Sequence, residues 1–311
     1  MRTPRMVLTL SENWTIMSGR DVQQLVRWAR EAEDAGFDGV MIGEHIVLGP
    51  DADAQGRMAN PREDAMPGNQ DPATPWPSPI GVLSAIAAVT ERIRLIAGAV
   101  LAPLRHPLLL AKELATLDLL SSGRLVVLPT VSWSRDEYAA LGVPFERRGE
   151  LLDDHLAAWQ VLWQDSPADF EGKHYRFQDV YLEPKPFRPS GPDLWFGGSK
   201  LHGRTLSRIA RYGVGLHLLT LLDVKSMQEI NNAMSGSGRT LSELEFVGGV
   251  PAVFRDDHPV ADLDRALEVI PFLLAYGFGT FCIKPAQFLD DPSQIGPFCK
   301  DVMRKVTALA S

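Results

Sequence analysis

Short apolar runs alternate with amphipathic segments along most of this chain. The runs are short enough to be strands buried on both faces. They lie at residues 6–10, 40–42, 94–100, 125–131, 194–196, 214–219, 246–254 and 280–284. Apolar residues recur at helical spacing between them. We expect helices at 21–35, 78–91, 106–120, 146–163, 204–212, 223–235, 262–275 and 292–309.

This alternation predicts one particular fold. Strands that alternate with helices form a parallel sheet, and eight such units close naturally into a (β/α)₈ TIM barrel. The competing doubly wound sheet lacks its best signature here, because no Gly-x-Gly-x-x-Gly follows the first strand. We therefore predict a single α/β barrel domain over residues 1–311.

Two segments depart from the regular alternation. Residues 46–78, after the second strand, are rich in Pro, Gly, Asp and Asn and show no apolar period. Loops of this length are lids, binding loops or disordered segments. Residues 170–189, after the fourth strand, read as an insertion of short extended pieces rich in aromatic residues and proline.

Composition narrows the class of protein. With 23% charged and 45% hydrophobic residues, the 311-residue chain resembles a globular protein. A net charge of −8 argues against a general nucleic-acid binder. Two cysteines are too few for a disulfide framework, and no apolar run approaches a membrane span. We expect a cytoplasmic protein that binds neither nucleic acid nor membrane.

Candidate chemistry gathers where the strands end. In a parallel barrel these ends meet on one face, which holds the ligand. The second strand delivers Glu44 and His45, the third Ala99 and Val100. The fourth adds Thr130, Ser132 and Trp133, and the fifth Gly197, Gly198 and Ser199.

The glycine turn and the histidine each have two interpretations. Two glycines before a helix let backbone N–H groups approach a phosphate, with Lys200 or Arg204 adding charge, but a tight turn needs glycine equally. His45 beside Glu44 can act as an acid–base pair, since histidine titrates near neutrality, or it can be structural.

Other residues suggest pocket walls rather than chemistry. Trp14, Trp76 and Trp133 fall in loops and either wall an apolar pocket or anchor those loops. The histidines show no close metal-ligand spacing, so we expect no metal site. A barrel aldolase would need a lysine at a strand end, and Lys284 is the candidate.

Several motifs together resemble the luciferase-like monooxygenase superfamily, and most of all its branch of coenzyme F420-dependent oxidoreductases. The matching segments are 36–39 (GFDG), 43–45 (GEH), 92–95 (RIRL), 100–103 (VLAP), 105–107 (RHP), 111–114 (AKEL), 134–142 (SRDEYAALG), 180–186 (VYLEPKP) and 194–199 (LWFGGS). The resemblance runs from the first strand to about residue 220. It implies a barrel with an insertion.

The resemblance also implies where a deazaflavin or flavin would bind. A non-prolyl cis peptide at the end of the third strand, matching Ala99–Val100, would press against the ring. His45 would lie near the redox centre with Glu44 beside it, and Gly197–Ser199 would hold the phosphate. Family members usually have a glycine-rich fourth-strand end. Thr130 and Ser132 stand there instead, so hydroxyl groups are expected to reach the cofactor.

Three functions follow from the resemblance. The first is an F420-dependent oxidoreductase that moves a hydride between cofactor and a small organic substrate, with Trp14 and Trp133 in the substrate pocket. The second is an FMN-dependent monooxygenase. The third is a non-catalytic flavin-binding protein. A separate flavin or F420 reductase would supply the reduced cofactor, and a homodimer is expected by resemblance.

Overall fold

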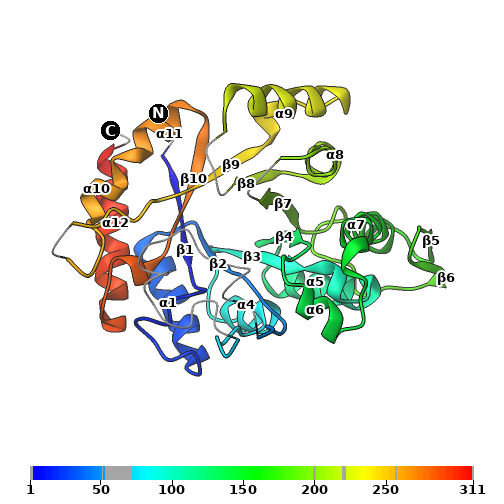
Figure 1. Cartoon of the computed structure of the whole chain (residues 1–311), viewed down its shortest axis with the longest axis horizontal. Helices are drawn as coiled ribbons and strands as arrows, with labels where there is room; N and C mark the ends of the chain where they lie inside the picture. Colours follow the sequence, from blue (N-terminus) through cyan, green and yellow to red (C-terminus); the bar gives the residue numbers. More distant parts are fainter. Residues whose placement is uncertain are drawn as a thin grey trace.

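The expected (β/α)₈ barrel is confirmed. The computed structural model describes residues 3–50, 52, 72–198, 201–218, 222–255 and 258–309. Within these ranges eight parallel strands close in the order β1, β10, β9, β8, β7, β4, β3, β2 (Figure 1). Their bounds are β1 Arg5–Thr9, β2 Gly39–Ile42, β3 Arg94–Leu101, β4 Leu125–Thr130, β7 Asp193–Gly198, β8 Gly215–Leu218, β9 Glu245–Gly249 and β10 Phe278–Ile283.

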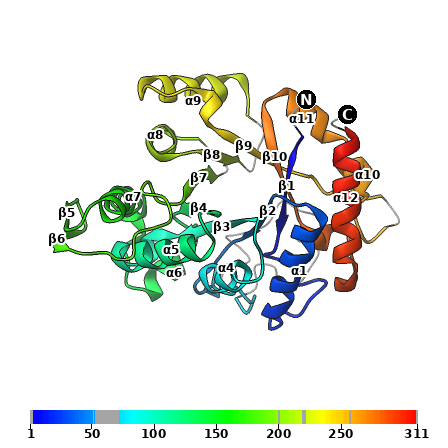
Figure 2. The ribbon, with the colours of Figure 1, turned by 180° about the vertical axis from the view of Figure 1, so that it is seen from behind.

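Helices surround the strands, and Figure 2 shows the same arrangement from behind. Their bounds are α1 Val22–Ala35, α4 Pro79–Ala87, α5 Pro107–Leu120, α6 Arg135–Ala140, α7 Arg148–Gln164, α8 Gly203–Tyr212, α9 Val224–Gly236, α10 Leu263–Leu267, α11 Val269–Ala275 and α12 Ile295–Leu309. Local signals explain the ends of α1. The Asp21 side chain accepts from the Gln24 N–H at 3.2 Å, and Gly36 ends the helix with φ of 95°.

Three features of the structure differ clearly from the sequence prediction. The helix expected at 262–275 breaks at Glu268 into α10 and α11, because Pro271 lacks an N–H and its ring would clash with the Leu267 carbonyl. The strand expected at 246–254 ends at Gly249. The short helix α6 was not anticipated.

The insertion forms a small antiparallel pair, β5 (Ala168–Glu171) and β6 (Arg176–Val180). It projects beyond α7, away from the barrel (Figure 1). The other irregular segment, 46–78, lies partly outside the described residues, since 51 and 53–71 are not among them.

Inside the barrel, ionic and apolar layers are stacked. At the amino ends of the strands, the Glu245 carboxylate accepts hydrogen bonds from two Arg94 nitrogens, at 2.8 and 3.0 Å. It also forms an ion pair with Arg5 at 3.0 Å. Burial alone would raise the pKa of Glu245, but the Arg94 hydrogen bonds hold it below its usual value. The Arg94 guanidinium also lies over the Trp195 ring. Above it lies an inner cluster of apolar side chains, Val7, Met41, Ile96, Val126, Leu128, Trp195, Val247 and Cys282.

Candidate active site at the carboxyl ends of the strands

The centre of the site is a buried histidine–glutamate pair. His45 follows β2, and its Nδ1 lies 3.2 Å from Oε2 of Glu137 in α6. The Glu137 side chain is fully buried, whereas the His45 side chain is 10% exposed. A carboxylate can only accept, so Nδ1 carries the proton and Nε2 is the ring nitrogen left to exchange one with a bound molecule.

Two further donors hold the Glu137 carboxylate in place. The Ile46 N–H donates to Oε1 at 2.8 Å, and the Ser132 hydroxyl donates to Oε2 at 2.6 Å. The Ser134 N–H donates in turn to Ser132 Oγ at 3.2 Å. Ser132 adopts φ of 59°, which turns the chain sharply after β4 and aims its hydroxyl at the carboxylate. Buried polar groups require such partners, and this network supplies them.

Helix α6 explains how Glu137 reaches His45. Ser134 caps the helix, and its hydroxyl accepts from the Glu137 N–H at 3.4 Å. The fully buried Tyr138 donates its hydroxyl to the Val131 carbonyl and fixes α6 against the end of β4. Burial raises the pKa of Tyr138 well above its usual range. We did not identify Glu137 from the sequence, although the spacing Ser134-x-x-Glu137 is that of a capping box.

Two tryptophans pack against the His45 ring. Trp76 and Trp133 make edge-to-face contacts with it, at centroid distances of 4.9 and 5.1 Å. The indole N–H groups of Trp76 and Trp14 are buried and have no hydrogen-bond partner among the described residues. Trp133, predicted to line the substrate pocket, and Trp76 therefore both lie beside His45. Trp14, after β1, is half-buried and is not one of these ring contacts.

Glu44 does not pair with His45, which corrects the expectation. Both of its oxygens bind Arg105, at 2.8 and 2.7 Å, and Oε1 also accepts from the Leu101 N–H at 2.6 Å. Successive residues of an extended chain point to opposite sides, so Glu44 faces Arg105 while His45 faces Glu137. Glu44 is a structural brace between the ends of β2 and β3.

The cis peptide is also one residue away from its expected place. It joins Gly98 to Ala99, not Ala99 to Val100. The register of β3 against β4 shifts at this point. Ala99 packs against the inner cluster, whereas Val100 is fully buried in the core between barrel and helices. The Val100 side chain therefore cannot contact a ligand, and Ala99 is the residue that can.

The fourth and fifth strand ends complete the rim of the site. Thr130 ends β4 and is half-buried there. Gly197 and Gly198 end β7, and Gly198 has φ of 143° with open space where a side chain would stand. Ser199 and Lys200 lie outside the described residues.

The helix after this turn is already capped. His202 accepts from the Thr205 N–H at 3.3 Å, where α8 begins. Arg204, considered above as a source of charge, lies 3.6 Å from both Glu150 and Asp153. Among the described residues of this turn, Gly198 is the one that borders open space.

Lys284 follows β10 and lies beside the first strand end. Its Nζ is 2.7 Å from Glu12, and both side chains are nearly buried. A Schiff-base lysine has to present a free amine to a carbonyl, and here the Lys284 amine is engaged by the Glu12 carboxylate. This pairing disfavours the aldolase interpretation.

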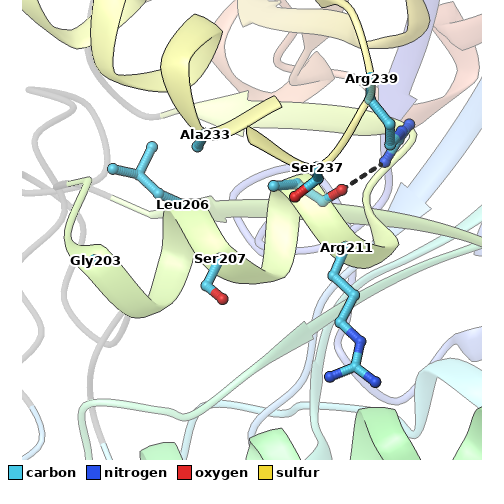
Figure 3. A pocket seen from close by; sticks show the side chains of 8 residues that line it. Gly203, Leu206, Ser207, Arg211, Ala233, Ser237 and Arg239 are labelled. Atoms are coloured by element: carbon cyan, nitrogen blue, oxygen red, sulfur yellow. Dashed lines mark hydrogen bonds between the residues drawn. The ribbon is translucent and has the colours of Figure 1, made fainter. Parts of the chain in front are cut away.

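A hollow lies on the outside of the barrel. It has a volume of about 560 Å³ and lies between α8 and α9, where Figure 3 shows Leu206, Ser207 and Arg211 around it. Arg239 donates to the Ile209 and Ala210 carbonyls and to Glu243, so its charge holds the end of α8. Figure 3 draws Arg239 with one of these hydrogen bonds. This hollow is separate from the strand ends.

Two features are absent from the described ranges. No group of three or more His, Cys, Asp or Glu side chains among these residues could hold a metal ion. No helix formed by the described residues has the length and apolar character that crossing a bilayer requires.

Comparison with known protein families identifies the family of this chain. The luciferase-like monooxygenase model matches residues 3–298. The chain belongs to the luciferase-like monooxygenase family. The resemblance expected from its motifs is therefore confirmed.

Curated relatives match the chain over part of their length. An uncharacterized protein of Mycobacterium tuberculosis is 37% identical over 171 residues, or 53% of this chain and 57% of that protein. The FMNH(2)-dependent dimethylsulfone monooxygenase of Pseudomonas putida is 31% identical over 131 residues, or 41% of this chain and 36% of that enzyme. The matched part thus spans about half, or less, of these relatives.

Solved structures share the luciferase-like fold over the whole chain. Monooxygenase RslO1 from Streptomyces bottropensis aligns with a TM-score of 0.78 and 19% identity, over 99% of this chain and 100% of that one. An F420-dependent secondary alcohol dehydrogenase aligns with a TM-score of 0.70 and 15% identity, over 98% and 99%. At these identities the likeness concerns the fold alone.

Proposed function

We propose that this luciferase-like protein is a coenzyme F420-dependent oxidoreductase that transfers a hydride between the deazaflavin and a small organic substrate. The observation that carries the proposal is the His45–Glu137 pair at the carboxyl end of the barrel. Hydride transfer to a carbonyl group requires a proton at the oxygen, and the reverse reaction must remove that proton. A histidine held in one tautomer by a buried carboxylate suits both directions.

The residues at the strand ends fit a flavin-type cofactor. A flat ring needs closely packed strand ends without protruding side chains, and Gly43 after β2, Gly98 in β3 and Gly197 in β7 allow this, because a Cβ at each would meet protein atoms within 3.1 Å. Gly198 leaves its backbone open for a phosphate. Trp76 offers a buried indole N–H without a partner among the described residues. When bound, the cofactor would supply the hydride chemistry.

The protein's own residues then have three tasks. When both ring nitrogens are protonated, His45 gives the Nε2 proton to the substrate oxygen during reduction, and the neutral ring takes that proton at Nε2 during oxidation. Glu137 keeps the other proton on Nδ1, so that Nε2 is the nitrogen that exchanges. Trp76 and Trp133 pack on the His45 ring, keep water away from it and orient the substrate.

An FMN-dependent monooxygenase is the second candidate. Partial similarity to the Pseudomonas putida monooxygenase favours it. The same strand ends would hold FMN, because both cofactors share a phosphate and a tricyclic ring. In either case a separate reductase would supply reduced cofactor by diffusion, and we propose a homodimer on family resemblance. A non-catalytic flavin-binding protein is the third candidate, and it would not require an acid–base residue such as His45.

Fluorescence titration of the purified protein with F420 and with FMN separates the candidates. The first proposal expects F420 to bind at least tenfold more tightly than FMN, and turnover to proceed without oxygen. The opposite preference, together with a requirement for oxygen, supports the monooxygenase. Binding of neither compound would contradict both. If His45→Ala bound cofactor normally and retained full turnover, the acid–base role would be wrong.

A further inference from the structure

A second histidine lies on the wall of the barrel opposite His45. His217 belongs to β8, and in the closed strand order β8 lies four strands from β2 in either direction. Its neighbours in register are Gly197 on β7 and Val247 on β9. Val247 belongs to the inner cluster, and residues in register on adjacent parallel strands share a face. The preceding residue, Leu216, packs in the outer core. His217 therefore points into the barrel.

His217 is half-buried at this position. Burial lowers the pKa of its imidazole to about 4, so the ring is neutral at pH 7. A neutral imidazole can donate one hydrogen bond and accept another.

Two glycines lie at the strand ends on either side of β8. A Cβ at Gly197 would lie 2.0 Å from the His217 carbonyl oxygen, so only glycine lets β7 come this close to β8. Gly249, at the end of β9, is exposed, and a Cβ there would meet nothing within 4 Å. Gly249 shares a register position with Cys282, which belongs to the inner cluster. Gly249 therefore leaves open space at the carboxyl end of β9, through which a flat molecule could approach His217.

We propose that His217 is a cofactor-binding residue, whose neutral imidazole hydrogen-bonds an uncharged polar group, a ring carbonyl or ring N–H, of the bound deazaflavin or flavin. This inference rests on the proposed function. His45 and His217 then have different tasks. His45, fixed by Glu137, exchanges a proton with the substrate, whereas His217 has no carboxylate among its register neighbours and orients the ring.

Two measurements test the role of His217. Cofactor titrations should give a Kd about tenfold higher for His217→Ala than for the unaltered protein, which corresponds to about 1.4 kcal/mol. His217→Asn keeps a neutral donor and should stay within threefold. His258→Ala is the matched control, because His258 is exposed on the surface, and it should leave the Kd unchanged. In ¹⁵N-histidine NMR of the unaltered protein, the His217 ring signals should shift on addition of F420 or FMN, but not of inorganic phosphate.

The outcomes separate this inference from the proposed function. If the unaltered protein binds a cofactor and His217→Ala binds it within twofold, the role of His217 is wrong and the proposed function stands. Unmoved His217 signals, or a shift caused by phosphate alone, lead to the same conclusion even if His217→Ala fails to fold. Binding of neither F420 nor FMN to the unaltered protein would overturn both.

Discussion

Nδ1 of His45 lies 3.2 Å from Oε2 of Glu137, a residue 92 positions further along the chain. The contact joins the end of β2 to helix α6 after β4. It fixes the tautomer of the histidine and leaves Nε2 for proton exchange. The arrangement gives His45 a defined chemical role and makes Glu137 a positioning residue, because Glu137 acts through His45.

Replacing Glu137 by Gln should slow turnover by about 100-fold, since an amide can present its N–H group to Nδ1 and reverse the tautomer. Cofactor Kd should stay within threefold, because Glu137 is fully buried and does not reach the ligand. Steady-state kinetics and titration of the same preparation separate the two effects.

The double variant His45→Ala/Glu137→Gln provides the decisive comparison. If Glu137 acts through His45, the double variant should be hardly slower than His45→Ala alone. Multiplicative losses would show that the two residues act independently. Glu146→Gln removes an exposed glutamate of the same region and should leave turnover unchanged.

Replacing Glu44 by Gln should destabilise the fold more than it affects chemistry. It weakens a bidentate pair with Arg105 and the bond from the Leu101 N–H, at a side chain only 2% exposed. Breaking a buried pair in this way costs about 3 kcal/mol. Urea unfolding should show a lower midpoint for Glu44→Gln. If the urea midpoint were unchanged and turnover were lost, Glu44 would have a catalytic role instead of a structural one.

Two glycine substitutions at the barrel mouth should have opposite outcomes. Gly197→Ala must push β7 from β8, because the new Cβ would lie 2.0 Å from a backbone oxygen, and it should cost about 1–3 kcal/mol of stability. Gly249→Ala enters open space and should be tolerated. Thermal unfolding measures both. Equal effects of the two substitutions would contradict the placement of these strand ends.

The stability of the fold should fall as pH drops from about 6.5 to 4. Burial lowers the pKa of His217 to about 4, so in this range the unfolded chain binds a proton that the native protein does not. The free energy of unfolding then rises with pH, by on the order of 3 kcal/mol over this window. His155, whose pKa burial also lowers, contributes in the same direction. Urea unfolding at several pH values should show a shallower dependence for His217→Asn than for His258→Asn.

Periodic features of the sequence predicted the barrel well. Strand positions follow from apolar runs that must be buried on both faces, and Asp21 and Gly36 mark helix ends by local chemistry. The division at Glu268 was missed because the apolar period continues across it. Pro271 carried the signal, since its ring is incompatible with the preceding turn.

The site was harder to predict, because its partners are distant in sequence. Glu44 is adjacent to His45 and looked like its partner, but adjacent residues face opposite ways. Glu137 reaches His45 because it lies on α6, and this helix is too short to show a helical period of apolar residues in the sequence. Likewise, the cis peptide bond lies at Gly98–Ala99, where the register of β3 against β4 shifts. No pattern in a single sequence indicates the position of this shift.

The ionic layer at the amino ends of the strands has a kinetic consequence. Arg5, Arg94 and Glu245 close that end of the barrel, and Trp195 packs directly above them. Within the described part of the chain, this end is therefore closed to a cofactor-sized molecule, and the opposite mouth is the way into the interior. If cofactor and substrate share this single entrance, the one that binds deeper must bind first and dissociate last. Steady-state patterns should thus follow a compulsory order of addition rather than a random one.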